Sequence, residues 1–521
     1  MDKIIDQCIR VEGGNPTRYL LQTNSDNLNQ SEPFRKITFG ERDKYKPHKT
    51  ILMVGETGTG KTTLINAMIN YMLSVKREDK VWFEITDDQS DRTSAHSQTI
   101  SITVYGFYPQ ESKTDLTIID TPGYGDTRGA DLDKQIAESL LSLCKSAEGI
   151  HEIDAVCLVM MAHQNRLSDR QRYIFDAVQS LFGRDIAENI ILLFTHSTGA
   201  RPKAALTAVK EAKVKCAVND KNQPVCFLFD NCQSETADEE DEEEDDEDHE
   251  PRMDQSWNCS FRGMAGLFKL LDNIKPKGLE MTRNVVQKRK QLEANISNLK
   301  ERVQVMELKL NELKQTQAAL EKNKEHITEN KNFEYEVEVP YKEKVDIDRS
   351  VAKEAMCCSV CEENCHYPGC WWVSKIKWCS VMKAEHCRVC SNKCHYSKHV
   401  KEAKIYKTKT KKEKRKYEDL KKKYDGKIGH GVSLVQKLEE ELQELEKEKI
   451  KLVIEAFDCV ETLQMIALNT DSVIILLHID FLIKKLKEIN EPEKVEILEN
   501  IKKRVGEGNT AALGYMTRLL N

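Results

Sequence analysis

The stretch ILMVGETGTGKTTLINAMI, residues 51–69, constrains this chain more than any other part of it. Residues 51–54 are apolar and predict a short buried strand, and the apolar residues after Lys61 recur at helical spacing. Between them the sequence matches the phosphate-loop pattern G-x-x-x-x-G-K-S/T in the strand-to-helix context that this motif requires. Glycines let such a loop wrap around a phosphate, and the N–H groups at the helix start attract its negative charge. The stretch therefore predicts a nucleotide site.

The loop assigns roles to individual residues. The ammonium of Lys61 would reach the β- and γ-phosphates, and the hydroxyl of Thr62 would bind Mg²⁺. A chance glycine turn is the alternative, and the flanking strand and helix argue against it. The predicted phosphate-binding residues are Gly55, Glu56, Thr57, Gly58, Thr59, Gly60, Lys61, Thr62 and Thr63.

A second part of the site is expected where the third candidate strand ends. Asp120 closes that strand, and Gly123 follows three residues later. In GTP-binding switches a D-x-x-G sequence places its carboxylate on the magnesium shell and its glycine N–H on the γ-phosphate. We therefore expect Asp120 to hold Mg²⁺ through water and Gly123 to sense the γ-phosphate. A threonine of the first switch should also reach the ion, and Thr99 is the candidate, with Ser97 and Ser101 as rivals.

From residue 47 to about residue 274, short apolar runs alternate with helical patterns. This alternation predicts an α/β domain, in which helices cover both faces of a mostly parallel sheet. The acidic run at residues 235–250 predicts a solvated loop without chemistry. The candidate strands are residues 50–55, 101–107, 116–120, 155–161, 190–194 and 225–229.

Three further motifs stand in this region: DTPGYGDT, HQNRLSDRQRYIFDAVQSLFG at residues 163–183, and ENIILLFTHS. Together they resemble the septin-like GTPases of the TRAFAC class, especially the immunity-associated nucleotide-binding (IMAP) branch, over about residues 47–275. The resemblance implies a P-loop NTPase G domain that binds GTP or GDP with Mg²⁺. It also implies dimerisation across the nucleotide face, filaments or membrane-associated scaffolds. The residues matching the R-F/Y-S/T box and the motifs after it are Arg166, Leu167, Ser168, Phe182–Gly183 and Leu193–Thr195.

The base-reading position departs from this family. Members read guanine with an aspartate at the end of the fifth strand, and here Thr195 and His196 stand in that place. The hydroxyl could still accept one hydrogen bond, and the imidazole could stack on the base. Asn231, after VCFLFD, could back the base, or it could be a simple loop asparagine.

A second departure concerns hydrolysis. Tyr124 stands where fast small GTPases have a water-orienting glutamine. Hydrolysis should therefore be slow, or be completed by a residue of a partner subunit. Arg128 is a candidate for that residue, and a solvent-facing arginine is the alternative. The residues on which we expect hydrolysis to depend are Lys61, Thr99 and Gly123.

Beyond residue 280 the sequence predicts a helical arm. Apolar residues alternate spacings of three and four through residues 292–327 and again through residues 435–463, which favours a coiled coil. The two runs could pair within one chain as an antiparallel hairpin, or between chains. The alternating segments 333–344 and 402–412 predict an antiparallel ribbon between the runs. Its cross-strand partners would be Glu334, Glu336 and Glu338 with Lys404, Lys407 and Lys409.

Nine of the 17 cysteines fall between residues 357 and 394, in a duplicated pattern. CSVCEENCHYPGC at residues 358–370 and CRVCSNKCHYSKH at residues 387–399 align at an offset of 29 residues. Each copy offers four soft ligands at spacings typical of tetrahedral zinc, and the prediction is a structural Zn²⁺ site. The predicted sets are Cys358, Cys361, Cys365 and Cys370 for one ion, and Cys387, Cys390, Cys394 and His399 for the other.

Several alternatives for these cysteines stay open. His366 and His395 are rival ligands, and ligands could be exchanged between the two copies. Spacings of three and four would also put the cysteines on one face of a helix as ordinary core residues. Disulfides rank last, because we expect a cytoplasmic protein: the N-terminus MDKIIDQCIR has no apolar segment typical of a signal peptide.

Length and composition limit the architecture. The chain has 521 residues and suggests about three domains, and its 32% charged and 7% aromatic residues favour a soluble protein rich in exposed helix. No stretch is apolar and long enough to span a membrane. The predicted segments are 1–46, an N-terminal segment; 47–276, the G domain; 281–330, the first coiled-coil arm; 333–413, a ribbon with the cysteine-rich insert 357–399; 414–463, the second arm; and 464–521, C-terminal helices.

The sequence favours a nucleotide-dependent switch. A slow GTPase would pair its G domains as a homo-oligomer when GTP is bound, and its zinc-tipped arm would contact protein partners. One alternative is a scaffold that binds nucleotide without hydrolysing it. Another is a zinc-hook coiled-coil ATPase, which would need a split head and an acidic pair where Asp120 and Thr121 stand. Nucleic acid is not an expected partner, because glutamates accompany the lysines of residues 401–423.

Overall fold

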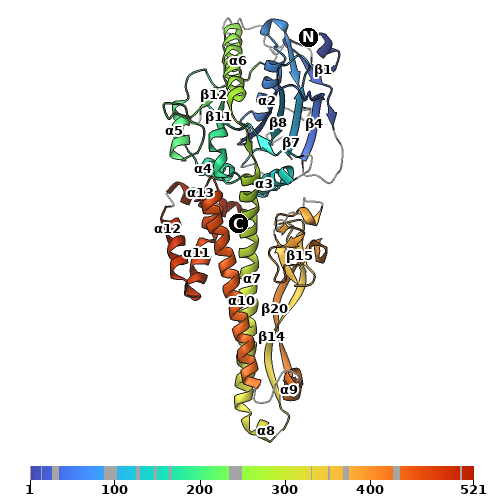
Figure 1. The fold of residues 1–521 in the computed structure, drawn as a ribbon, viewed down its shortest axis with the longest axis vertical. Coiled ribbons are helices and arrows are strands. Elements are labelled where there is room, and N and C mark those ends of the chain that lie inside the picture. Colours follow the sequence, from blue (N-terminus) through green and yellow to red (C-terminus); the bar gives the residue numbers. More distant parts are fainter. Residues whose placement is uncertain are drawn as a thin grey trace. The chain divides into compact units, whose positions relative to one another are not determined.

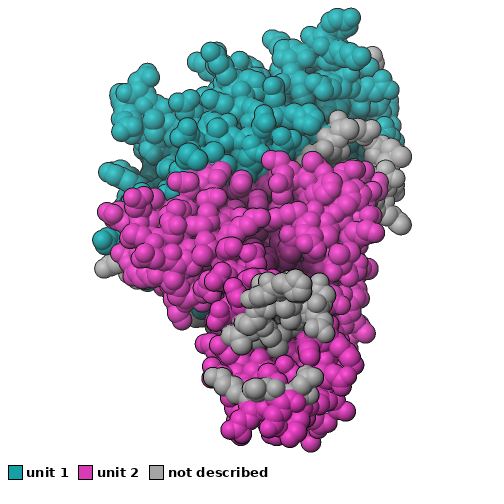
Figure 2. Space-filling view, turned by 60° about the horizontal axis from the view of Figure 1, so that its bottom comes forward, with its two compact units in different colours: residues 1–286, 464–477, 503–521 teal, residues 287–463, 478–502 magenta. Residues whose placement is uncertain are grey.

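The computed structural model divides the chain into two compact units, which are coloured separately in Figure 2. Unit 1 comprises residues 1–286, 464–477 and 503–521, and unit 2 comprises residues 287–463 and 478–502. No described helix is long and apolar enough to cross a membrane. The structure describes residues 2–12, 14–25, 34–86, 102–124, 130–145, 149–163, 167–233, 249–329, 331–349, 352–367, 375–425, 434–504 and 507–520.

Unit 1 contains an eight-stranded sheet with the strand order β12-β11-β10-β5-β8-β7-β4-β3. Neighbouring strands are parallel except in the pairs β7–β8 and β3–β4. The six strands predicted from apolar runs all belong to this sheet, which confirms the α/β class. The strands are β3 (Asn24–Ser25), β4 (Phe34–Gly40), β5 (His48–Gly55), β7 (Ile102–Tyr108), β8 (Asp115–Asp120), β10 (Ala155–Met161), β11 (Ile190–Thr195) and β12 (Cys226–Leu228).

Helices cover both faces of this sheet, as Figure 1 shows. Strand β5 explains why two cores form: Leu52 and Val54 point into one, whereas Ile51 and Met53 point into the other. The first core also takes apolar residues from α3, α4 and α5, and the second takes them from α2 and α6. These helices are α2 (Lys61–Met72), α3 (Ala130–Lys145), α4 (Asp169–Gln179), α5 (Lys203–Glu211) and α6 (His249–Asn273).

Smaller elements complete the part of unit 1 that precedes α7. Strands β1, β2 and β6 form a separate three-stranded sheet, and β9 pairs with β13. The bounds are α1 (Asp2–Ile5), β1 (Cys8–Glu12), β2 (Thr17–Leu21), β6 (Val81–Glu84), β9 (Glu152–Ile153) and β13 (Lys277–Gly278), with 3₁₀ turns at Arg77–Asp79 and Arg184–Asn189.

Part of the C-terminal region packs on the G domain. The carboxylate of Asp176 in α4 accepts hydrogen bonds from Asn469 Nδ2 at 2.6 Å and from the backbone N–H of Val473. Ala512 and Met516 of α13 (Glu507–Leu520) are buried in the first core. The last helix therefore belongs to unit 1, although it lies far from the G domain in sequence.

Most of helix α7 (Glu280–Lys322) and most of α10 (Leu434–Ile466) belong to unit 2, where the two helices lie side by side, as Figure 1 shows. Asn295 contacts Cys459 and Arg302 contacts Glu448, so the two helices run antiparallel within one chain. The heptad pattern was compatible with pairing of the two helices within one chain or between chains, and in the structure they pair within one chain. The other helices of this region are α8 (Lys324–Thr328), α9 (Tyr417–Asp425), α11 (Val473–Glu488) and α12 (Pro492–Arg504).

The ribbon forms, but its register differs from the predicted one. Strand β14 (Glu334–Asp346) pairs antiparallel with β20 (Lys404–Lys416) over their whole lengths. The predicted partners of the glutamates were wrong, because β20 continues beyond the segment that was taken for the strand. Glu334, Glu336 and Glu338 lie opposite Lys416, Lys414 and Lys412, whereas Lys404, Lys407 and Lys409 lie opposite Asp346, Glu343 and Tyr341.

Short strands carry the cysteines that the ribbon encloses. Strand β15 pairs with both β16 and β19, and β17 pairs with β18. The cysteines therefore lie on strands and turns, and not on one face of a helix as core residues would. The elements are β15 (Ala355–Cys358), β16 (Glu363–His366), β17 (Met382–Lys383), β18 (His386–Cys387) and β19 (His399–Glu402), with 3₁₀ turns at Ile376–Trp378 and Tyr396–Lys398.

Candidate nucleotide site and metal centre

The phosphate loop connects the buried end of β5 to the first residue of α2. Gly58 has a φ of 81° and Gly60 has a φ of 77°. Residues with a Cβ rarely adopt this backbone conformation. Gly60 caps α2 directly before Lys61. The two glycines thus let the chain turn and direct the free N–H groups of the helix start at one point, which suits a phosphate.

Lys61 lies inside this loop and is only 7% exposed. Its ammonium donates to the carbonyl oxygens of Gly55 at 3.2 Å and Glu56 at 3.0 Å. Burial lowers the pKa of the Lys61 ammonium, and the nearby carboxylates of Asp120 and Glu56 oppose that shift. The lysine is therefore held where a phosphate would meet it, beside the carboxylate predicted to bind magnesium.

The D-x-x-G segment lies directly on the phosphate loop. The backbone N–H of Tyr124 donates to Gly55 O at 3.0 Å, and the N–H of Thr57 donates to Tyr124 O at 3.3 Å. A Cβ on Gly123 would lie 2.3 Å from Thr57 Oγ1 and 2.6 Å from Thr57 N. Asp120, which is 1% exposed, ends β8 in register with Met53 of β5. The structure thus brings the phosphate loop, Asp120 and Gly123 together.

Gly123→Ala should separate GTP binding from GDP binding. The added Cβ would meet backbone atoms of Thr57, which cannot move aside as a flexible side chain could, so the segment would have to leave the loop. Because the glycine N–H of a D-x-x-G sequence contacts only the γ-phosphate, we expect GTP affinity to fall about tenfold or more and GDP affinity less than about threefold. Titration with fluorescent nucleotides measures both.

Gly278→Ala is the matched control for that experiment, because a Cβ at Gly278 has no neighbour within 4 Å and φ there is not positive. The control should bind both nucleotides like the unaltered chain. Equal losses for GTP and GDP in Gly123→Ala would contradict the assigned role.

The ends of β10 and β11 carry two histidines beside the loop. The rings of His163 and His196 have their centroids 6.3 Å apart, and a Cβ on Gly60 would lie 4.0 Å from His196 Nε2. His196 is exposed and has a φ of 50°. The carboxyl ends of parallel strands are where nucleotides bind in such sheets, so this is the expected base end of the site.

Thr195 and Asn231 flank these histidines. The Thr195 hydroxyl donates a hydrogen bond to Thr59 O at 2.8 Å, and this bond connects the end of β11 to the phosphate loop. Asn231 Oδ1 accepts from Ser260 at 3.4 Å, and the buried Nδ2 has no hydrogen-bond partner within the described part of the chain. Asn231 thus offers a buried hydrogen-bond donor, and its role toward a base stays a prediction.

Two contacts at the site were not foreseen from the sequence. One is the approach of His163 to His196, and the other is an ion pair of 3.0 Å between Arg170 Nε and Glu56 Oε1. Arg170 is presented by α4, whose N-terminus is capped by Ser168. The predicted Thr99, its rivals Ser97 and Ser101, and also Arg128 and Arg166, lie outside the described residues.

Residues 49–246 match the AIG1 family model. The match covers less than half of the chain, and it identifies the matched segment as a G domain of the AIG1 type. The match supports a GTP-binding protein. The contiguous match argues against the zinc-hook ATPase, whose head would be split. No curated protein matches the chain.

Solved structures of GTPases resemble the AIG1-type domain remotely. Toc33 from Arabidopsis thaliana in complex with GDP and Mg²⁺ is 15% identical, with 43% of this chain and 85% of that chain covered and a TM-score of 0.30. Toc33 in complex with Mg²⁺ and GMPPNP is 16% identical, with 44% and 88% covered and a TM-score of 0.28. Elongation factor SelB from Methanococcus maripaludis is 12% identical, with 44% and 35% covered and a TM-score of 0.24. Sequence identities and TM-scores this low support no conclusion about the function of this chain.

The second candidate site is the cysteine-rich insert of unit 2. All described cysteines are free thiols, so no disulfide forms among them. The potential metal ligands group across the two sequence copies and not within each copy, which is the exchange that the sequence left open. Cys370 lies outside the described residues. The two groups are Cys358, Cys361, Cys390 and Cys394, and Cys365, Cys387, Cys390 and His399.

The two histidines predicted as rival ligands have other partners. His366 Nδ1 lies 3.1 Å from Cys379 Sγ, and His395 Nδ1 lies 2.9 Å from Ser397 Oγ. Neither histidine belongs to the two groups. His399 remains as the one imidazole among the candidate ligands of the described residues.

Proposed function

We propose that this chain is a slow GTPase that switches its own assembly through the AIG1-type domain. The proposal is supported by the close packing of Gly123 and Tyr124 against the phosphate loop. The γ-phosphate would arrive where this segment lies, so the segment must rearrange when GDP is exchanged for GTP. That rearrangement would then reach the surface that pairs with a second G domain.

Slow hydrolysis follows from the residue that occupies the water-orienting position. Tyr124 has no carboxamide to orient an attacking water, whereas fast small GTPases use glutamine there. A partner subunit could supply the missing group, and Arg128 is the candidate within this chain. We propose that the homo-oligomer is the active state, that the arm of unit 2 contacts protein partners, and that the protein works in the cytoplasm.

The competing proposal is a scaffold that binds GTP without hydrolysing it, and the same tyrosine favours it. Single-turnover hydrolysis at increasing protein concentration separates the two. For the switch we expect the rate per chain to rise roughly tenfold or more as G domains pair, and Arg128→Ala to remove most of that rise. Nucleotide that stays intact at every concentration would instead support the scaffold.

A further inference from the structure

Both groups of potential metal ligands in unit 2 contain Cys390, and this sharing is the basis of the inference. Within each group one donor atom of every residue lies within 4.8 Å of the others. Zn²⁺ in structural sites takes four ligands in a tetrahedron. The seven residues can therefore complete two tetrahedra among the described residues only if Cys390 belongs to both.

The spacing of the sulfur atoms fits zinc. Cys361 Sγ and Cys394 Sγ lie 3.8 Å apart. Two sulfurs each about 2.3 Å from one tetrahedral ion would be separated by about 3.8 Å. This pair therefore already has the separation that a shared zinc ion would impose.

Backbone N–H groups point at the sulfurs in both copies. The N–H of Cys361 donates to Cys358 Sγ at 3.4 Å, and the N–H of Cys390 donates to Cys387 Sγ at 3.4 Å. Cys390 Sγ itself accepts from the N–H of Cys394 at 3.2 Å. Such bonds orient the sulfur atoms, as hydrogen bonds around metal ligands commonly do.

The histidine is also oriented as a ligand. His399 Nδ1 lies 3.1 Å from the carbonyl oxygen of His395, so the ring proton belongs on Nδ1. The other nitrogen, Nε2, is buried and has no hydrogen-bond partner in the described part of the chain. One donor atom of this ring lies within 4.8 Å of the sulfur atoms of its group, as a metal ligand would.

We propose that unit 2 binds two zinc ions in one centre, with the thiolate of Cys390 bridging them. Cys358, Cys361 and Cys394 complete the first ion's shell, and Cys365, Cys387 and His399 complete that of the second. Soft sulfur donors with one imidazole select Zn²⁺ over Mg²⁺ or Ca²⁺. The centre is independent of the nucleotide site.

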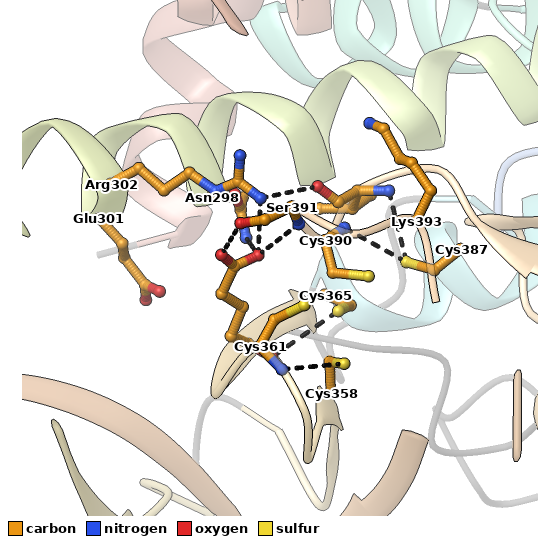
Figure 3. Close-up of polar contacts among 12 residues, drawn as sticks. Asn298, Glu301, Arg302, Cys358, Cys361, Cys365, Cys387, Cys390, Ser391 and Lys393 are labelled. Carbon is orange, nitrogen blue, oxygen red and sulfur yellow. Dashed lines mark hydrogen bonds and ion pairs between the residues drawn. The ribbon is translucent and has the colours of Figure 1, made fainter. Parts of the chain in front are cut away.

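Hydrogen bonds connect both neighbours of Cys390 to helix α7, and Figure 3 shows Arg302 of this helix close to Ser391. Arg302 Nη2 donates to Glu363 Oε2 at 2.7 Å and to Val389 O at 3.3 Å. The backbone N–H of Ser391 donates to the same Glu363 oxygen at 3.0 Å. Residues 389 and 391 are thus both held, which fixes Cys390 between them. The centre therefore links the two cysteine copies to the arm.

Ordinary packing alone gives this insert little stability. Four of the ten buried members of its cluster are proposed ligand cysteines, and its buried aliphatic members include only Met356, Val381, Met382 and Val389 beside an alanine. Modules with so few large aliphatic residues usually need a metal or a disulfide to stay folded. Bound zinc would supply that stability.

The test uses the full chain expressed with zinc. Native mass spectrometry should find two zinc ions per chain, and X-ray absorption at the zinc edge should show a second zinc about 3.8 Å from the first, the separation that two zinc–sulfur bonds of about 2.3 Å at one sulfur produce. Two ions without that zinc–zinc signal would overturn the bridge, and so would a single ion. Because this measurement needs no variant, it does not depend on whether a variant folds.

Variants test the ligand assignment. Cys390→Ser should reduce zinc from two ions to one or none, whereas Cys361→Ser should leave the second ion bound. Cys357→Ser is the matched control, since Cys357 is buried beside Cys358 and belongs to neither group. Cys370→Ser should also retain two ions. Loss of one ion in Cys370→Ser together with full retention in Cys390→Ser would show that no bridge exists.

Discussion

Replacing Lys61 with alanine should lower the affinity for GTP and for GDP by about 100-fold or more. The ammonium is buried in the phosphate loop, 3.0 Å and 3.2 Å from two of its carbonyl oxygens, and is positioned to meet the β- and γ-phosphates. Hydrogen bonds to charged groups contribute roughly 1.5–3 kcal/mol each, and two of them account for a loss of that size. Calorimetric titration of both nucleotides measures the effect.

Lys210→Ala is the matched control, because Lys210 is an exposed lysine in the last turn of α5. It should bind nucleotide like the unaltered chain. Circular dichroism should show that Lys61→Ala is still folded, because the hydrogen bonds of the Lys61 ammonium to described residues lie within the loop. An affinity within about threefold of the unaltered chain would contradict the assigned site.

Arg302→Ala is expected to be the most destabilising single change in unit 2. The Arg302 and Glu363 side chains are 10% and 9% exposed and lie 2.7 Å apart. Removing one partner of a buried ion pair leaves the other charge uncompensated and costs about 3–5 kcal/mol. Hydrogen exchange measured by mass spectrometry on α7 and on the cysteine insert should show this loss of protection, and the zinc content should fall with it.

Two further variants show whether that cost comes from the buried charge. Lys447→Ala breaks an ion pair of 2.8 Å to Glu444 on the same arm, but both side chains are about 70% exposed, so we expect less than about 1 kcal/mol. Replacing both buried partners, with Arg302→Met and Glu363→Gln together, should restore more than half of the stability. If Arg302→Ala costs no more than Lys447→Ala, the buried pair does not hold this region.

Local patterns predicted the parts of the fold that local physics determines. The phosphate loop was recognisable because Gly60 and Lys61 stand between an apolar strand and an apolar-periodic helix, and both elements formed as expected. Asp120 and Gly123 were predicted because D-x-x-G follows the strand that pairs with β5. The two strands of the ribbon were recognisable from their alternation.

Features that depend on long-range contacts could not be predicted in the same way. The ribbon register was misjudged because lysines recur throughout β20 and occupy both of its faces, so the charge pattern is compatible with several registers. The duplicated cysteine spacing suggested one ion per copy, whereas the fold brings Cys390 beside ligands of the other copy. The pairing of His163 with His196 depends on two strands adjacent only in the sheet.

The most direct measurement of the central claim is the mass of the nucleotide that co-purifies with the full chain. Native mass spectrometry of the unaltered protein should find one guanine nucleotide with Mg²⁺ per G domain, and Lys61→Ala should carry none. An adenine nucleotide in the unaltered protein, or guanine nucleotide retained in Lys61→Ala, would contradict the account.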